Sequence, residues 1–267
     1  MILGTLACMI IFNGTDITQF LSPSISTPQG VSIFRVMQMF YTTGLFIFPP
    51  VLLAILSSRN PRSFLWLYTP PLRFTFIAMV LMILAIPGIN LIASFNAIIP
   101  MPDLIDHLEA KAYELTKAFL TTDSTSILII NLFMVAVLPA IGEELLFRGV
   151  LQRQLCKLFQ NTFWGVLVAS IVFSTIHLQF HGFIPRMLLG MLFGYLLVWS
   201  GSIWVPIIVH FINNALAVLA FYYIGKGSIP HQVETMGQYQ QHWHIGVISL
   251  ALTLCLFWVL WRERVVD

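Results

Sequence analysis

Long, uninterrupted apolar runs dominate this sequence and leave few folds open to it. After an apolar N-terminal segment, seven further runs are each long enough, or nearly so, to cross a bilayer, which takes roughly 20 helical residues. They are Val31–Leu56, Phe74–Ile99, Ser126–Val150, Thr162–Phe180, Phe183–Trp199, Ile203–Ile224 and His244–Trp261. The runs lack the strict alternation of a membrane β-barrel. The sequence therefore predicts an all-α, polytopic membrane helix bundle of about eight transmembrane helices.

Composition supports a membrane protein. Of the 267 residues, 58% are hydrophobic and 9% are charged, whereas a typical soluble protein has roughly 25% charged residues. A net charge of +2 without any Lys/Arg run argues against nucleic acid as a partner and leaves the lipid bilayer as the expected surroundings. Cys8, Cys156 and Cys255 are scattered in apolar contexts and are expected to be packing residues. With no internal repeat or linker, residues 1–267 are expected to form a single membrane domain.

Charge asymmetry between the connecting segments predicts an orientation. The segments 57–73 and 152–160 carry Arg and Lys without any acid, and the C-terminus carries two arginines. By the positive-inside rule these parts belong to the cytoplasmic side, and the segments 101–124 and 225–243 to the opposite side. Both termini are then expected to be cytoplasmic, in a membrane that we expect to be the bacterial plasma (inner) membrane.

Two segments are not expected to cross the bilayer. The first twelve residues are too short for a full crossing, and we expect them to be the remainder of a transmembrane helix that starts further upstream. Residues 102–120 place Leu104, Leu108 and Leu115 near one face of a helix. This segment is expected to be an amphipathic helix on the membrane surface.

The fourth run contains the acids Glu143 and Glu144 and the base Arg148, although a charge inside a membrane is costly and tends to be kept for function or paired. Glu144 and Arg148 are four residues apart with the acid first, which favours an ion pair on one helix face. Glu143 is turned about 100° away and is free for chemistry. The alternative is that both acids simply reach out to the cytoplasmic surface.

Two further runs also carry polar groups. His177 lies near the end of the fifth, and the seventh contains His210 with Asn213 and Asn214. His210 and Asn214 are four residues apart and share a helix face. Such a set can supply a general base, a partner that orients it and donors for an oxyanion, whereas a lone membrane histidine is more often a hydrogen-bonded packing residue.

A metal site is a competing interpretation of the same residues. Two histidines and a carboxylate, here Glu143, His177 and His210, match a catalytic zinc set. The residues leave open whether the cofactor is a divalent metal such as zinc or there is none. His181 could join His177 if the fifth helix continued, but Gly182 and Pro185 predict that it ends, so His181 is expected in a loop. The other histidines considered, His231, His242 and His244, are expected to be solvated.

Three motifs, in order and on separate expected helices, resemble a known family. "EELLFR" at 143–148 is similar to EExxxR, "FSTIH" at 173–177 to FxxxH, and "HFINN" at 210–214 to HxxxN of the CPBP group of intramembrane proteases. That group includes the CAAX prenyl endopeptidases and Abi-like bacteriocin-processing and immunity proteins. The resemblance covers roughly residues 125–220, the expected catalytic core, and the family is described both as metalloproteases and as metal-free glutamate proteases.

The resemblance implies roles for individual residues. Glu143 would activate the attacking water with help from His177, while His210 and Asn214 would stabilise the tetrahedral oxyanion. The substrate would be a membrane-associated peptide or a protein C-terminus. Other intramembrane proteases are disfavoured, because HExxH, GxSG and GxGD motifs are missing. The resemblance also gives Glu144 and Arg148 the task of holding the site together.

Two other functions stay open. The protein could be a catalytically silent immunity or scaffold protein, or an ion-coupled transporter, since membrane Glu and His chains also relay protons. Pro87-Gly88 and Pro139 are expected to break helices, as in transporters, but no repeated halves are visible. One expectation conflicts with a shared site: the expected spans put Glu143 in the cytoplasmic third of the membrane and His177 nearer the external end.

Overall fold

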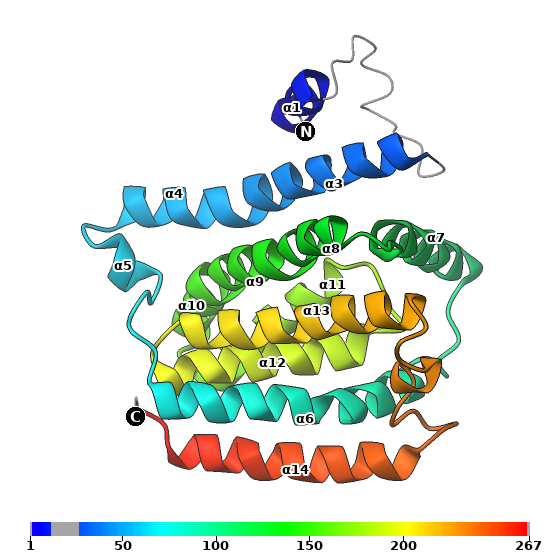
Figure 1. Cartoon of the computed structure of the whole chain (residues 1–267). Coiled ribbons are helices and arrows are strands. Elements are labelled where there is room, and N and C mark those ends of the chain that lie inside the picture. The colour runs from blue at the N-terminus through cyan, green and yellow to red at the C-terminus, as the bar shows by residue number, and fades with distance from the viewer. Residues whose placement is uncertain (1, 12–26, 266–267) are drawn as a thin grey trace.

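The computed structural model describes residues 2–11 and 27–265, and all regular elements within these ranges are helices (Figure 1). Six of them are long and apolar enough to cross a membrane, namely Pro28–Ser57, Leu72–Asn96, Thr125–Phe159, Phe183–Ser200, Trp204–Gly225 and Trp243–Arg262. The N-terminal helix and a shorter apolar helix bring the described apolar helices to eight. The protein is an integral membrane protein, and the expected all-α class is confirmed.

The first half of the chain forms one outer side of the bundle, part of the opposite side and a surface helix. Its elements are α1 (Ile2–Ile11), α3 (Pro28–Thr42), the π-helix η1 (Thr43–Ile47), α4 (Phe48–Ser57), α5 (Pro61–Phe64), α6 (Leu72–Asn96) and α7 (Asp103–Leu120). α3, η1 and α4 form one long helix along one side of the bundle (Figure 1). The amphipathic helix expected over 102–120 is confirmed as α7.

The second half supplies the centre and the opposite side. Its elements are α8 (Thr125–Asn131), η2 (Leu132–Val137), α9 (Leu138–Glu143), η3 (Glu144–Gln152), α10 (Arg153–Phe159), α11 (Thr162–Thr175), α12 (Phe183–Ser200), α13 (Trp204–Gly225), the 3-10 helix η4 (His231–Val233) and α14 (Trp243–Arg262). η2 and η3 are π-helical. In Figure 1, α6 and α14 lie side by side on the face opposite α3 and α4, and the central helices fill the space between.

The largest apolar core joins four helices. It contains buried side chains of α6, α12, α13 and α14, among them Leu81, Phe193, Val209 and Leu260. On the outer faces of the bundle many large apolar side chains are exposed, among them Leu254 at 67%. Exposed apolar side chains suit contact with lipid, where no hydrophobic force drives helices together and packing decides which faces meet.

The expectation that Pro87-Gly88 breaks a helix is wrong, because α6 runs through both residues. Proline lacks the N–H of a regular helical hydrogen bond, and membrane helices tolerate it when neighbouring groups satisfy the backbone. Ser249 of α14 does this here: its hydroxyl donates to Leu84 O at 2.5 Å and accepts from Gly88 N at 2.9 Å.

The fourth transmembrane helix is longer than expected. Residues 125–159 are helical throughout, so Pro139 does not break it and the loop expected at 152–160 is instead mainly helix α10. Hydropathy reports which residues suit lipid, and a helix with charged residues can continue past the lipid boundary. Arg153 of α10 donates to Phe64 O at 2.6 Å, which fixes this extension to α5.

Candidate active site

A buried chain of polar groups crosses from the fourth helix to α13. Glu144 Oε1 lies 2.8 Å from His210 Nδ1, and Glu144 Oε2 lies 3.1 Å from Arg148 Nε. The Glu144 side chain is fully buried, and the side chains of Arg148 and His210 are only 2% and 5% exposed. The ion pair expected from the spacing of Glu144 and Arg148 is therefore present, and it is extended by an imidazole from another helix.

Arg148 is surrounded by aromatic rings and a backbone carbonyl. Its guanidinium carbon lies 4.5 Å from the centroid of the Phe173 ring and 5.5 Å from that of Phe193. Its Nη2 donates to Gly190 O of α12 at 3.2 Å. Cation–π contacts and the Glu144 carboxylate offset part of the cost of a charge out of water, although the buried Arg148 Nη1 has no hydrogen-bond partner among the described residues. Arg148 thus links η3 to α11 and α12.

Glycines of α12 allow η3 to approach closely. A Cβ at Gly194 would lie 2.7 Å from Gln152 Oε1 and 2.8 Å from a methyl of Val166. With glycine there, Gln152 Nε2 donates to Gly194 O at 3.2 Å, one turn beyond the contact between Arg148 and Gly190. This close packing keeps the charged face of η3 against the bundle.

Glu143 faces the other nitrogen of the same imidazole. Glu143 Oε2 lies 3.9 Å from His210 Nε2, and the Glu143 side chain is 13% exposed. That separation is too long for a hydrogen bond, but two atoms at this distance can each contact one small molecule, such as a water, at about 2.8 Å. The two adjacent glutamates therefore have different surroundings: Glu144 is paired, and Glu143 lies beside His210 without a direct hydrogen bond to it.

His177 lies in the turn after α11, next to Phe173. Its Nδ1 donates to Phe173 O at 2.8 Å, which in the neutral ring leaves a lone pair on Nε2. The Phe173 ring centroid is 4.9 Å from that of His177 and 6.2 Å from that of His210. Both histidines of the expected site therefore lie against one phenylalanine.

Helix lengths remove the conflict over the depth of His177. α10 and α11 pack as a hairpin about the turn at Gln160. Glu143 lies 16 positions before the end of α10, and His177 lies 15 positions after the start of α11. At about 1.5 Å per residue, both are roughly 20 Å from the turn. The expected position of Glu143, in the third of the membrane nearest this turn, ignored the extension by α10.

Asn214 contacts the fourth helix one turn beyond the histidine. Its Nδ2 donates to Val135 O at 3.1 Å, and its Oδ1 accepts from Asn213 Nδ2 at 3.0 Å. Val135 is four positions before Pro139, which has no N–H to offer that carbonyl. Asn214 therefore supplies a donor where the proline lacks one, and its second amide N–H is available for other contacts.

The sequence left open a metal site made by Glu143, His177 and His210. Within the described ranges, no group of three His, Cys, Asp or Glu side chains is placed to hold a metal ion. A metal held by Glu143, His177 and His210 therefore stays a prediction, and the chemistry below is derived from the side chains alone. His181 lies in a turn, as expected, where its Nε2 is 2.9 Å from Asp106 Oδ1 of α7. The other three histidines considered, His231, His242 and His244, are exposed.

One charged residue near the site escaped the sequence reasoning. Arg186 lies one turn into α12 and interacts electrostatically with Glu143. Its guanidinium donates to Gln179 O at 3.1 Å and to Gln179 Oε1 at 2.6 Å. An arginine inside the apolar run 183–199 was the signal that could have identified it.

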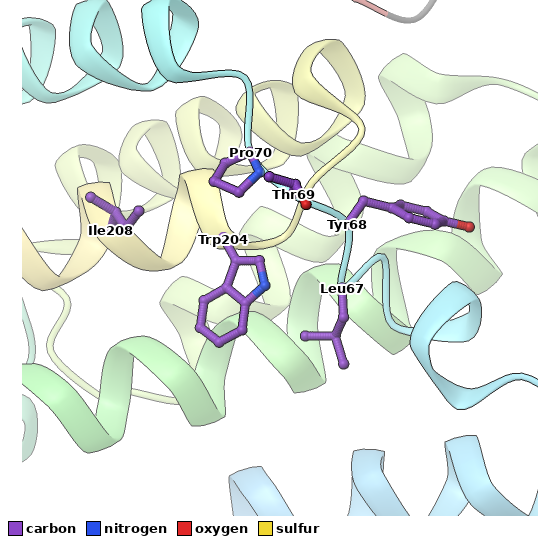
Figure 2. A pocket seen from close by; sticks show the side chains of 6 residues that line it. All are labelled: Leu67, Tyr68, Thr69, Pro70, Trp204 and Ile208. Atoms are coloured by element: carbon purple, nitrogen blue, oxygen red, sulfur yellow. The ribbon is translucent and has the colours of Figure 1, made fainter.

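A shallow pocket lies near one end of α13, apart from this cluster. Figure 2 shows its lining from the segment before α6 and from α13. The pocket has a volume of about 330 Å³ and is lined by Leu67, Tyr68, Thr69, Pro70, Trp204 and Ile208. Ile208 is two positions before His210, so the two side chains point to roughly opposite faces of the helix. The pocket and the polar cluster are therefore on different sides of α13.

Known proteins resemble the part of the chain that holds this cluster. Residues 125–216 match the family model described as type II CAAX prenyl endopeptidase Rce1-like. A Bacillus subtilis (strain 168) protein named "Uncharacterized protein YpbD" is 32% identical over 90 residues, which are 32% of this chain and 43% of YpbD. The matched part thus spans less than half of that relative. No solved structure matches the chain. The family resemblance expected from the three motifs is confirmed over this central segment.

Proposed function

From the similarity of residues 125–216 to the Rce1-like type II CAAX prenyl endopeptidases, we propose that this protein is an intramembrane endopeptidase. It hydrolyses a peptide bond in a membrane-associated peptide or near a protein C-terminus. The observation that carries the proposal is the placement of Glu143 Oε2 3.9 Å from His210 Nε2, next to a second glutamate that is already paired.

Glu143 is the general base. A water held between Glu143 and His210 gives up a proton to the carboxylate as its oxygen attacks the scissile carbonyl carbon. The proton then passes to the leaving amine, so the carboxylate is regenerated. A positioned general base contributes typically 10²- to 10⁴-fold to the rate, which is the size of effect assigned to Glu143.

His210 and Asn214 stabilise the oxyanion that forms on the carbonyl oxygen. With Glu144 accepting from His210 Nδ1, protonation of the ring places the second N–H, on Nε2, on the side of Glu143. The free amide N–H of Asn214 lies one turn along the same helix face. Each donor of such a site is worth about 10²- to 10³-fold in rate.

His177 assists Glu143, and Glu144 with Arg148 holds the site. The Nε2 lone pair of His177 can accept a proton, or a hydrogen bond from the O–H of a water, which suits a group that orients the attacking water. Glu144 fixes His210 by one oxygen and Arg148 by the other. These two residues position the reacting groups without touching the substrate.

The protein acts within a bacterial plasma membrane with both termini in the cytoplasm. The basis is the excess of Arg and Lys in the connection 57–73 and in α10, which the positive-inside rule assigns to the cytoplasmic side. The substrate then reaches Glu143 from within the bilayer.

The test is cleavage of a labelled peptide library by the detergent-purified protein and by Glu143→Gln, His210→Ala and a matched surface control, Glu234→Gln. Glu234 is exposed and lies in the connection before α14. Cleavage that is lost in the first two variants and kept in the control supports the peptidase.

A chelator arm reports whether an added metal is needed. Folding of every variant is checked by thermal unfolding in the same detergent. If no form cleaves any peptide although all are folded, the silent immunity or scaffold protein and the ion-coupled transporter become the better explanations.

A further inference from the structure

Arg186 of α12 is hydrogen-bonded to the turn that carries His177. The turn between α11 and α12 contains His177, Leu178 and Gln179 in succession, and Gln179 accepts from Arg186 through both its backbone and its side-chain oxygen. Leu178 has a left-handed backbone, with a φ of 53°, and is 62% exposed. Non-glycine residues in that conformation cluster at functional sites, where the surroundings hold them. The guanidinium is thus fixed to the backbone that carries a residue of the proposed site.

Hydrogen bonds from two other helices, α6 and α7, also hold this turn. The Glu109 carboxylate of α7 accepts from the backbone N–H groups of Phe180 and His181. Asn96 of α6 donates to Phe180 O at 2.7 Å and accepts from Ile184 N at 3.0 Å. Arg186 therefore has little freedom to move away from the proposed site.

The Arg186 guanidinium forms no direct ion pair among the described residues, and the carboxylates of Glu143 and Glu109 act on it only at longer range. The described carboxylates that form ion pairs do so with Arg73, Arg148, His181 and His210. Both hydrogen bonds of Arg186 go to neutral oxygens of Gln179, and a guanidinium has five N–H donors. A positive charge in a membrane helix is normally paired or placed on a substrate path. The three remaining donors can thus serve an anion that arrives with the substrate.

We propose that Arg186 binds the C-terminal carboxylate of the peptide substrate, so that the site measures its cleavage position from a free C-terminus. The planar guanidinium pairs with a carboxylate through two parallel hydrogen bonds, which fixes orientation as well as charge. At about 3.3 Å per extended residue, the separation of Arg186 from Glu143 sets how many residues are released. The inference rests on the proposed function.

The test compares two fluorescein-labelled peptides that end in the same apolar residues and differ only at the C-terminus, a free acid and a carboxamide. Cleavage and binding anisotropy are both measured for wild type, Arg186→Gln, Arg186→Lys and the control Arg73→Gln. Arg73 is 82% exposed and pairs with Glu263 at 2.7 Å, away from the site.

In wild type, we expect the free acid to exceed the carboxamide by about 10- to 100-fold in kcat/KM and to bind more tightly, because charge-assisted hydrogen bonds are strong. Arg186→Gln brings the acid-to-amide ratio close to one, Arg186→Lys restores part of it, and Arg73→Gln keeps the wild-type ratio. If Arg186 served folding alone, its substitution would lower kcat/KM for both peptides together and leave the acid-to-amide ratio unchanged.

Equal treatment of acid and carboxamide by wild type, in cleavage and in binding, overturns the assignment while leaving the peptidase intact. A preference that persists in Arg186→Gln overturns it too, because another group must then read the carboxylate. If wild type cleaves neither peptide but binds the acid more tightly through Arg186, the carboxylate site stands and the proposed peptidase activity falls.

Discussion

Glu144 Oε1 lies 2.8 Å from His210 Nδ1, and this contact joins two transmembrane helices through fully or almost fully buried side chains. Because the other oxygen of Glu144 is 3.1 Å from Arg148 Nε, one carboxylate faces two nitrogen groups. A buried charge network of this kind is sensitive to the loss of any member, because the remaining charge is then left without a partner.

Glu144→Gln should lower the free energy of unfolding by about 3 kcal/mol, because Arg148 would remain buried and unpaired. Arg148→Gln should have a similar effect. The double variant Glu144→Gln/Arg148→Gln should lose clearly less stability than the two single variants added together, because neither charge is then left without a partner. Thermal and chemical unfolding in detergent measure the three values.

The exposed ion pair between Arg73 and Glu263 provides the control for this cycle. Its nitrogen–oxygen distance is 2.7 Å, but the Arg73 side chain is 82% exposed. Exposed ion pairs contribute about 0–1 kcal/mol, so Glu263→Gln should change stability little. Additive losses in the buried cycle would show that Glu144 and Arg148 do not depend on each other.

Much of the fold could be predicted from hydropathy. A membrane helix needs a long apolar run to cross the lipid, so the runs Phe183–Trp199 and Ile203–Ile224 agree with the helices to within one residue at each end. The extension by α10 could not be predicted this way, because charged residues occur both in helices that extend beyond the lipid and in loops.

The membership of the site was easier to predict than its geometry. Helix periodicity on the fourth helix predicted that Glu144 and Arg148 pair and that Glu143 points elsewhere, but no pattern within one helix reveals that His210 bridges toward both glutamates. Contacts between helices depend on rotation and packing. Arg186 was missed because its hydrogen-bond partner Gln179 lies outside the run 183–199, so no spacing within that run connects the arginine with the site.

The α10–α11 hairpin should not tolerate a side chain at Gly165. A Cβ there would lie 2.3 Å from Cys156 Sγ and 2.7 Å from the Cys156 backbone nitrogen, so the helices would have to separate. Gly165→Ala should therefore lower the free energy of unfolding by about 2 kcal/mol or more, which is near the upper end of overpacking effects. It should also reduce cleavage, because His177 would move relative to Glu143.

Gly225→Ala is the matched control, because a Cβ at Gly225 would meet nothing within 4 Å. Alanine at this helix end should leave stability within about 1 kcal/mol of wild type. Unfolding in detergent, with cleavage measured on the same samples, compares the two variants. Equal stability of both would mean that the hairpin is packed more loosely than its backbone contacts indicate.

The contribution of the Asn214 side chain to stability should depend on the presence of Pro139. Asn214→Ala removes the donor to Val135 O and should cost about 1 kcal/mol of stability, a typical value for one hydrogen bond. In a Pro139→Ala background the backbone N–H of residue 139 can donate to Val135 O, so the same substitution should cost less. A double-mutant cycle by thermal unfolding measures this coupling, and a coupling of zero would contradict it.

Activity separates this structural role of Asn214 from its proposed catalytic one. Pro139→Ala keeps the Asn214 amide and should retain most cleavage. Asn214→Ala should reduce cleavage in both backgrounds by about 10²-fold, because the oxyanion donor is absent in each. If Pro139→Ala restored the activity of Asn214→Ala, then support of the fourth helix would be the whole contribution of this asparagine.

Glu109 on the surface helix α7 should influence catalysis although it is remote from the reacting groups. Its carboxylate accepts from the backbone N–H groups of Phe180 and His181, three and four residues after His177. Glu109→Ala removes the hydrogen bonds on one side of this turn and should allow His177 to move. We expect kcat to fall by about 10-fold, which corresponds to about 1.4 kcal/mol, a typical contribution of one hydrogen bond. KM should change less. Glu114→Ala, an exposed acid on the same helix, should leave both parameters at their wild-type values. Equal behaviour of the two variants would mean that α7 only covers the bundle and does not position His177.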